Sequence, residues 1–253
     1  EIYYRRAGAL LCLVYVLGGN DFHGENIIAH GAQPVLVDLE TIISYKMLQF
    51  HEEYEEQEGV REAQNFIDLL QESVLGIGFL PVWLNARGVS VDYGALTGVI
   101  PGSIPGYGEK KIKVFEHYEA LRDGFQKAYN FFVQKREVLL EQLPQVFCNT
   151  LLRIILRPTN VYARLLLHGL STQFLTSGFT YSIEMERMAP AFLIKVAEEK
   201  VKKIWPIFLA EQEALEGRDI PIFYGRADER NIYSGDGLLC EEFFADSALE
   251  RIR

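Results

Sequence analysis

The polar stretch NDFHGEN carries Asp21, His23 and Asn26, and the segment VDLE after it carries Asp38 and Glu40. A phosphotransferase needs a carboxylate that orients the substrate hydroxyl and accepts its proton, and oxygen ligands for the magnesium ion that screens the phosphates. In kinase-type sites the catalytic Asp and the metal-binding Asn are five residues apart on one loop, as Asp21 and Asn26 are here. A further magnesium carboxylate then follows the next hairpin, where Asp38 closes the apolar run PVLVD. These residue types and spacings point to phosphoryl transfer.

The same stretch also fits a polar turn without chemistry, because Asp, His and Asn tolerate turn backbone and bond locally. The surroundings favour catalysis, since an apolar helix precedes the loop and a hairpin that presents two carboxylates follows it. A Walker-type enzyme is excluded because the chain has no G-x-x-x-x-G-K-[ST] loop. A kinase-like site would keep its glycine-rich loop and lysine in a lobe before Glu1, so we expect the phosphate-gripping half outside this chain.

Local patterns define the elements that must position the loop. Residues 1–19 combine good helix formers with a terminal Gly pair, which predicts a helix that ends at the loop. Two short β-branched runs, NIIA and PVLVDLETI, are separated by turn residues and predict a hairpin. We therefore expect the order helix, loop, hairpin.

The remainder is expected to be irregular first and helical afterwards. HEEYEEQEGVREAQ has almost nothing to bury and predicts a solvated helix or mobile segment. Residues 76–109 are rich in Gly and Pro and predict a long irregular region with short strands at most. From residue 114 onward the pattern predicts a long amphipathic helix, a helix after Pro158, and at least two more that Pro190 and Pro206 break. GRDIPIFY then returns to extended structure.

Composition excludes several classes of function. The net charge of -10, with 25 Lys and Arg against 35 Asp and Glu, gives no basic surface for nucleic acid or a membrane. Three widely spaced cysteines suggest neither a disulfide framework nor a metal site, and fit a reducing cytoplasm. The most apolar run, AGALLCLVYVLGGN, has 14 residues, fewer than the roughly 20 of a membrane-spanning helix. We expect a cytoplasmic chain without nucleic acid partners or a transmembrane segment.

Longer motifs follow one another along the chain. They are DFHGENIIAHGAQPVLVDLETI, DYGALTG, LLRIILRPTNVYARLL and GRDIPIF. In sequence and order they resemble the dehydratase domain of type 2 lanthipeptide synthetases, the LanM family. The family patterns are D-x-H-x-E-N-x-x-A with P-V-L-x-D-x-E-T, then R-x-x-x-R-x-T-x-x-Y and G-D-I-P-x-F. The resemblance covers nearly the whole chain.

The resemblance implies an α+β, predominantly helical fold with a lipid-kinase-like C-lobe, in which a catalytic loop and short β-hairpin precede a helical region. It implies one domain, 1–253, the C-terminal part of a dehydratase domain. Residues 1–50 would hold the loop and metal-binding hairpin, 51–112 an activation-type segment and irregular loops, and 113–253 the helical region with an elimination motif. We expect the nucleotide lobe and the zinc cyclase to be absent from this chain. Alone it should then bind ATP weakly and hold no zinc.

The activity implied is ATP- and Mg²⁺-dependent phosphorylation of Ser and Thr in a ribosomal precursor peptide, followed by phosphate elimination to dehydroalanine or dehydrobutyrine. By the motif match, Asp21 would be the carboxylate at the substrate hydroxyl and His23 its neighbour on the loop. Asn26 and Asp38 would be the magnesium ligands, and Glu40 would support the site. The partners implied are the precursor peptide with its leader and a peptide exporter complex.

Arg153 and Thr159 match family residues that serve elimination. Expelling phosphate builds negative charge on the leaving group, which a guanidinium fork and a nearby hydroxyl stabilise. The alternative is structural: Arg153 and Arg157 would pair with carboxylates, and Thr159 after Pro158 would cap a helix.

Two other functions stay open. A small-molecule phosphotransferase of the aminoglycoside or choline kinase type has similar D-x-H-x-x-N and D-x-E geometry, and an inactive kinase-like module would only bind a peptide. The R-x-x-x-R-P-T-x-x-Y segment favours the dehydratase, because simple phosphorylation does not need it. Intact Asp21, Asn26 and Asp38 argue against the inactive module.

Overall fold

The structure is a computed structural model that describes residues 1–46, 69–81, 83–86, 89–97, 100–107, 110–111, 114–157, 159–186, 198–235 and 237–252. The chain divides into two compact units. Unit 1 comprises Glu1–Ser44, Gly59–Cys148 and Ala248–Arg253, and unit 2 comprises Tyr45–Glu58 and Asn149–Ser247. The acidic segment HEEYEEQEGVREAQ lies outside the described residues, so its form stays a prediction.

Helix α1 (Ile2–Leu17) is the centre of unit 1. Its buried face includes Tyr4, Ala7, Leu11 and Val14, which belong to the hydrophobic core of the unit. The helix ends at Gly18, whose φ of 74° is left-handed, a conformation that glycine adopts without steric cost. The predicted helix with a glycine stop before the loop is confirmed.

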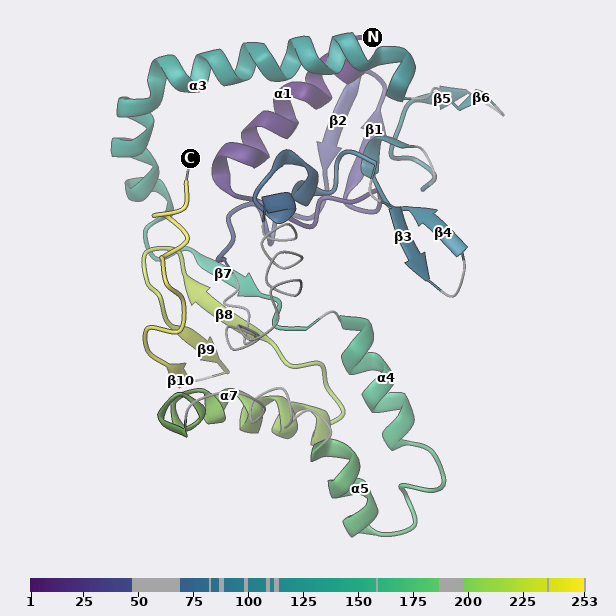
Figure 1. The fold of residues 1–253 in the computed structure, drawn as a ribbon, viewed down its shortest axis with the longest axis vertical. Coiled ribbons are helices and arrows are strands. Elements are labelled where there is room, and N and C mark those ends of the chain that lie inside the picture. The colour runs from purple at the N-terminus through teal and green to yellow at the C-terminus, as the bar shows by residue number, and fades with distance from the viewer. Residues whose placement is uncertain are drawn as a thin grey trace, which may run out of the picture. The chain divides into compact units, whose positions relative to one another are not determined.

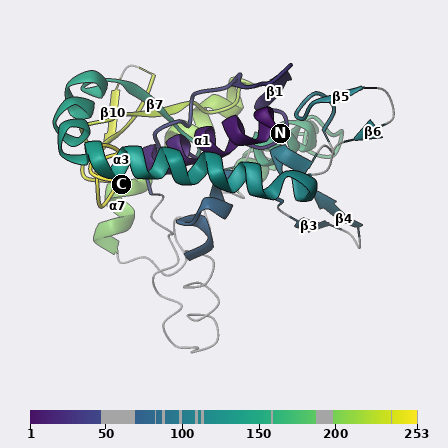
Figure 2. The same ribbon diagram turned by 90° about the horizontal axis from the view of Figure 1, so that it is seen from above.

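The long helix α3 (Tyr118–Phe147), preceded by the 3-10 helix η3 (Val114–His117), packs across α1. Figures 1 and 2 both show the two helices side by side near the start of each. A Cβ atom on Gly124 would lie 1.8 Å from the Arg5 carbonyl oxygen, and one on Gly8 would lie 1.9 Å from that of Leu121. The two glycines therefore let the backbones touch. The predicted amphipathic helix is confirmed.

Replacing Gly124 with Ala is expected to destabilise the protein by about 3 kcal/mol, because the added methyl group meets backbone that cannot rotate away. Urea denaturation of the full-length protein measures the change. Gly178→Ala is the matched control, since nothing lies within 4 Å of a Cβ atom there. Equal stability of the two variants would contradict the close helix crossing.

Among the described residues of unit 1, the strands form short antiparallel hairpins: β1 (Ile27–His30) with β2 (Gln33–Leu36), β3 (Trp83–Ala86) with β4 (Val89–Asp92), and β5 (Gly106–Tyr107) with β6 (Lys110–Lys111). Short 3-10 helices, η1 (Val74–Ile77) and η2 (Ala95–Thr97), lie between them in sequence. The first hairpin and the irregular region after it agree with prediction. Asp38, expected to close a strand, instead follows one. Strand β2 ends at Leu36 because its partner β1 begins at Ile27.

Unit 2 contains a four-stranded antiparallel sheet in the order β10-β9-β8-β7. Its strands are β7 (Leu151–Ile154), β8 (Phe223–Arg226), β9 (Ile232–Ser234) and β10 (Gly237–Cys240). The sequence predicts extended structure only near β8 and helix elsewhere from residue 114, so the helical description of 113–253 is wrong for the other strands. Four-residue apolar runs such as LLRI do not distinguish a strand from a turn of helix.

The helices of unit 2 are α4 (Thr159–Gly169), α5 (Gly178–Met185) and α7 (Glu198–Glu216). Pro206 was expected to break a helix but lies inside α7. Proline removes one backbone hydrogen bond, and burial of the neighbouring Ile204, Ile207 and Phe208 side chains offsets that loss. Pro190 lies outside the described residues.

Helices and small antiparallel sheets together make the α+β fold that the sequence predicts. Over the residues that the structure describes, no helix combines the length and the hydropathy needed to cross a bilayer. Among the described residues, no disulfide joins Cys12, Cys148 or Cys240.

Candidate active site

The loop at residues 20–26 is fixed by backbone hydrogen bonds to segments distant in sequence. The Asn20 N–H donates to the Thr41 carbonyl at 3.2 Å, and the Thr41 hydroxyl donates to the Asn20 carbonyl at 2.6 Å. The Phe22 N–H donates to the Ile77 carbonyl at 2.8 Å, and the Phe22 ring is fully buried. These bonds attach the loop to two buried residues, Thr41 and Ile77.

Asp21 has a left-handed backbone, with φ of 62°. A non-glycine residue costs roughly 1–2 kcal/mol in this conformation, although Asp tolerates it better than most. The Asn26 side-chain amide donates to the Asp21 carbonyl at 2.8 Å, and the Asn26 N–H donates to the His23 carbonyl at 3.0 Å. The loop therefore supports a strained carboxylate position, a feature that gathers at functional sites.

The segment after the first hairpin turns its carboxylates inward and its apolar side chains outward. Asp38 and Glu40 are half-buried, whereas Val37 and Leu39 are 51% and 55% exposed. The Val37 N–H donates to the Asn26 carbonyl at 3.1 Å, which ties this segment to the loop. The segment therefore has half-buried carboxylates beside exposed apolar side chains, the reverse of the usual pattern.

Charges around Asp21 shift its proton affinity. Partial burial raises the pKa of Asp21 above its usual range; Glu40, Asp38 and Glu25 raise that pKa further by like-charge repulsion, while His23 lowers it. The His23 Nε2 atom lies 3.6 Å from Asp21 Oδ1, and the Asp21 side chain is 50% exposed. The ionised carboxylate is thus a better proton acceptor than an isolated Asp, and a bound cation would relieve the repulsion.

Asn26 and Asp38 have the chemistry of magnesium ligands. The Asn26 amide nitrogen is used by the Asp21 carbonyl, so the amide oxygen remains as the coordinating atom. One Asp38 oxygen, Oδ1, accepts the Glu40 N–H at 3.1 Å, which orients the carboxylate. Within the described ranges no three His, Cys, Asp or Glu side chains gather as a cation site. A magnesium ion here would therefore draw its remaining oxygens from nucleotide and water, as is common for this metal.

Unit 2 brings Arg153 and Thr159 to one small hollow. Arg153 is on β7 and Thr159 is the first residue of α4. The hollow is also lined by Ile220 and Pro221 from the GRDIPIF motif. Two motifs that are separate in the sequence thus meet around the pair expected to serve elimination.

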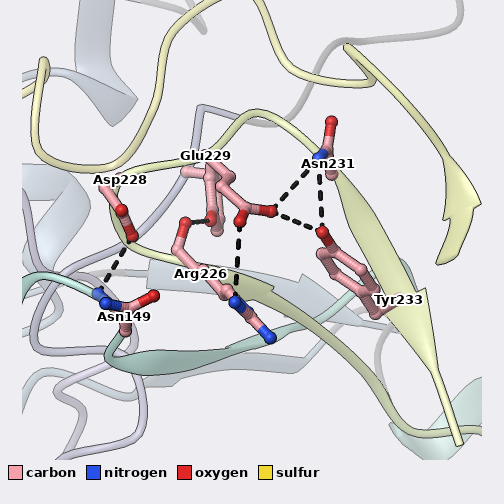
Figure 3. Close-up of polar contacts among 7 residues, drawn as sticks. Asn149, Arg226, Asp228, Glu229, Asn231 and Tyr233 are labelled. Atoms are coloured by element: carbon pink, nitrogen blue, oxygen red, sulfur yellow. Dashed lines mark hydrogen bonds and ion pairs between the residues drawn. The ribbon is translucent and has the colours of Figure 1, made fainter. Parts of the chain in front are cut away.

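A polar cluster at the connection from β8 to β9 fixes the entry to β7 (Figure 3). The Asn149 N–H donates to Asp228 Oδ1 at 3.0 Å. Glu229 accepts hydrogen bonds from the Tyr233 hydroxyl and, at 3.1 Å, from the Asn231 amide. The chain is therefore anchored at Asn149, two residues before β7 begins at Leu151.

The structural alternative for the arginine motif is confirmed for Arg157. Its Nε and Nη2 atoms donate to the two oxygens of Glu211 at 2.8 and 3.2 Å. Arg157 is thus committed to a carboxylate inside the unit.

A family model described as Domain of unknown function (DUF4135) matches residues 1–106 and 100–226. The chain belongs to the DUF4135 family. The matched ranges include both the loop around Asp21 and the hollow around Arg153 of this DUF4135 chain.

A curated relative of the DUF4135 chain is the lacticin 481/lactococcin biosynthesis protein LcnDR2 of Lactococcus lactis subsp. lactis. The two are 26% identical over 200 residues, and the alignment covers 65% of this chain. It covers 20% of the relative, so the chain spans about a fifth of the length of that protein. The similarity supports the sequence-based relation to lanthipeptide synthetases over part of the molecule.

Sequence reasoning missed the contacts that fix the DUF4135 loop. Phe22 and Gly24 donate to the backbone carbonyls of Ile77 and Tyr93. Every residue has a backbone carbonyl, so the sequence does not show which residues accept these hydrogen bonds. Tyr93 does lie in the DYGALTG motif on which the family resemblance rests. Glu211 was also missed, because its burial in α7 follows from packing alone.

Proposed function

We propose that the chain is part of an enzyme that phosphorylates Ser and Thr side chains of a precursor peptide with ATP and then eliminates the phosphate. The inward orientation of Asp38 and Glu40 beside Asp21 carries this proposal. Folding alone gives no reason to half-bury Asp38 and Glu40, whose charges raise the pKa of Asp21, while Val37 and Leu39 are exposed. A reaction that binds phosphate and a metal ion gives a reason for this arrangement, because the metal ion needs nearby carboxylates.

Phosphorylation uses the loop of unit 1, a kinase-like catalytic loop and hairpin. Asp21 accepts the proton of the substrate hydroxyl as the hydroxyl oxygen attacks the γ-phosphorus of ATP and ADP leaves, and His23 lies beside that carboxylate. Asn26 and Asp38 would hold the magnesium ion, and the Glu40 N–H orients the Asp38 carboxylate. ATP would supply the phosphoryl group, and the magnesium ion would screen its charge.

Elimination uses the hollow in unit 2. A base removes the α-proton of the phosphorylated residue, the Cα–H electrons form the Cα=Cβ bond, and the Cβ–O bond breaks as phosphate leaves with its electron pair. The Arg153 guanidinium and the Thr159 hydroxyl stabilise the developing charge on that phosphate. The second step distinguishes this function from that of a simple kinase.

The relative named for lacticin 481 and lactococcin biosynthesis supports a peptide substrate of the lantibiotic precursor class. We place the reaction in the cytoplasm, where ATP and newly made precursor peptide meet, with a peptide exporter complex as a later partner. This chain spans about a fifth of that relative, so the proposal concerns the full-length protein.

Mass spectrometry of a Ser- and Thr-rich precursor peptide, incubated with the full-length protein, ATP and Mg²⁺, tests the function. A loss of one water mass per modified residue is the expected result. Retained phosphate without that loss would indicate the kinase alternative. An unchanged peptide that still binds would indicate the inactive module.

Asp38→Asn is expected to raise the Mg²⁺ concentration needed for half-maximal phosphorylation by about 10-fold or more, because a neutral amide replaces the carboxylate ligand. A magnesium titration of phosphorylation measures this requirement. Glu25→Gln, an exposed carboxylate on the loop, should change it by about twofold at most. An unchanged requirement in Asp38→Asn would remove Asp38 from the metal site.

A further inference from the structure

Glu211 of α7 is a carboxylate with 0% exposed surface. Its Oε1 atom accepts hydrogen bonds from Arg157 Nε at 2.8 Å and from the Tyr162 hydroxyl at 2.6 Å, and its Oε2 atom accepts one from Arg157 Nη2 at 3.2 Å. Burying a carboxylate is costly unless it is paired and hydrogen-bonded in this way. Both partners belong to the single motif R-P-T-x-x-Y.

The two partners bracket Thr159. Arg157 lies before it on the connection from β7, and Tyr162 lies after it in the first turn of α4. Glu211 therefore ties the connection and the helix start to one point on α7. Arg157 and Tyr162 also line the hollow that Arg153 and Thr159 share. A shift of these hydrogen bonds would move Thr159 relative to Arg153 in the hollow.

Tyr162 stays protonated and is therefore a permanent hydrogen-bond donor to Glu211. Burial, followed by the nearby charge of Glu211, raises the pKa of Tyr162 far above its usual value. The hydroxyl thus keeps its proton and donates a hydrogen bond to Glu211 throughout the physiological pH range. Arg157, held by both oxygens of Glu211, is likewise kept from competing with Arg153 for the phosphate.

We propose that Glu211 is a positioning residue for phosphate elimination, which holds Arg157 and Tyr162 so that Arg153 and Thr159 meet the phosphate of the modified side chain. The inference rests on the proposed function and adds a residue outside the recognised motifs. Glu211 touches no reacting atom. Its effect passes through the two motif residues that it binds.

Glu211→Gln tests this role in the full-length protein. The variant keeps the size of the side chain and removes the charge that holds Arg157. With a phosphoserine-containing form of the precursor peptide as substrate, we expect elimination to slow by about 100-fold through kcat, since misplaced catalytic groups act on the chemical step. Phosphorylation of the unmodified peptide should stay within about twofold of wild type. Phosphopeptide should therefore accumulate.

Controls separate positioning from general stability. Glu213→Gln removes an exposed carboxylate from the same helix and should leave both steps unchanged. Tyr162→Phe removes one hydrogen bond to Glu211 and should slow elimination by about 10-fold, which keeps the test open if Glu211→Gln does not fold. Wild-type elimination rates in both variants, or equal losses of phosphorylation and elimination in Tyr162→Phe, would overturn the positioning role.

The same experiment keeps the two proposals distinct. If the wild-type protein neither phosphorylates nor dehydrates the peptide, the proposed function fails. If the wild-type protein dehydrates the peptide and Tyr162→Phe and Glu211→Gln do so equally well, only the role of Glu211 fails.

Discussion

Asp21→Asn in the full-length protein is expected to lower phosphorylation of a Ser- and Thr-rich precursor peptide by about 10³-fold, so that no dehydrated product forms. The amide keeps the shape of the side chain and tolerates the left-handed backbone, with φ of 62° at this position. It cannot accept the hydroxyl proton. Mass spectrometry of the peptide resolves both the phosphorylated and the dehydrated forms.

Glu25→Gln is the control for this substitution, because it removes a negative charge from the same loop at an exposed position. It should phosphorylate the peptide within about threefold of wild type. Dehydrated peptide made by Asp21→Asn would refute the role of Asp21 as proton acceptor.

The raised pKa of Asp21 gives the same substitution an effect on stability. Burial and neighbouring carboxylates disfavour ionised Asp21 in the folded state. This cost is absent below the pKa of the unfolded chain and is fully present above that of the folded chain. Asp21→Asn should therefore melt higher than wild type at pH 7, by up to about 2 °C given the solvent screening, and this advantage should disappear as the pH falls through the raised pKa.

Arg153→Ala is expected to let phosphopeptide accumulate, with elimination slowed by about 10²- to 10³-fold and phosphorylation retained. Arg153 lines the hollow, and its guanidinium is the group that the proposed function assigns to the leaving phosphate. Arg153→Lys should restore part of the rate, because an ammonium keeps the charge without the bidentate fork. Time courses of phosphorylated and dehydrated peptide measure the two steps.

Arg164→Ala provides the comparison for loss of a nearby arginine, since Arg164 is an exposed residue of α4. It should process the peptide like the wild type. If phosphorylation itself vanished in Arg153→Ala while Arg164→Ala stayed active, Arg153 would belong to the first step, and its assignment to elimination would be wrong.

Elements stabilised by neighbours in sequence were predictable. Helix α1 ends at Gly18, and the first hairpin turns between its two β-branched runs, because caps, turns and periodicity involve residues a few positions apart. The long amphipathic helix α3 follows from the same rule. The candidate residues Asp21, His23 and Asn26 were identified for a similar reason, since they lie on one loop.

Elements that depend on distant partners were predicted poorly. Strand β7 exists because it pairs with β8, and a four-residue apolar run does not state its partner. Pro206 continues α7 because burial around it offsets the missing hydrogen bond. In both cases tertiary packing overrides a local preference.

The sequence by itself determined which residues are proposed to bear the chemistry: the loop, the carboxylates of VDLE and the arginine motif each stand in one short segment. Only the tertiary structure decided how these residues are held. It turned Asp38 and Glu40 inward, and it brought Glu211 to Arg157 across 54 positions of sequence. The physical reason is that residue type and spacing fix what a side chain can do, whereas burial and pairing are set by the packing of segments far apart in the chain.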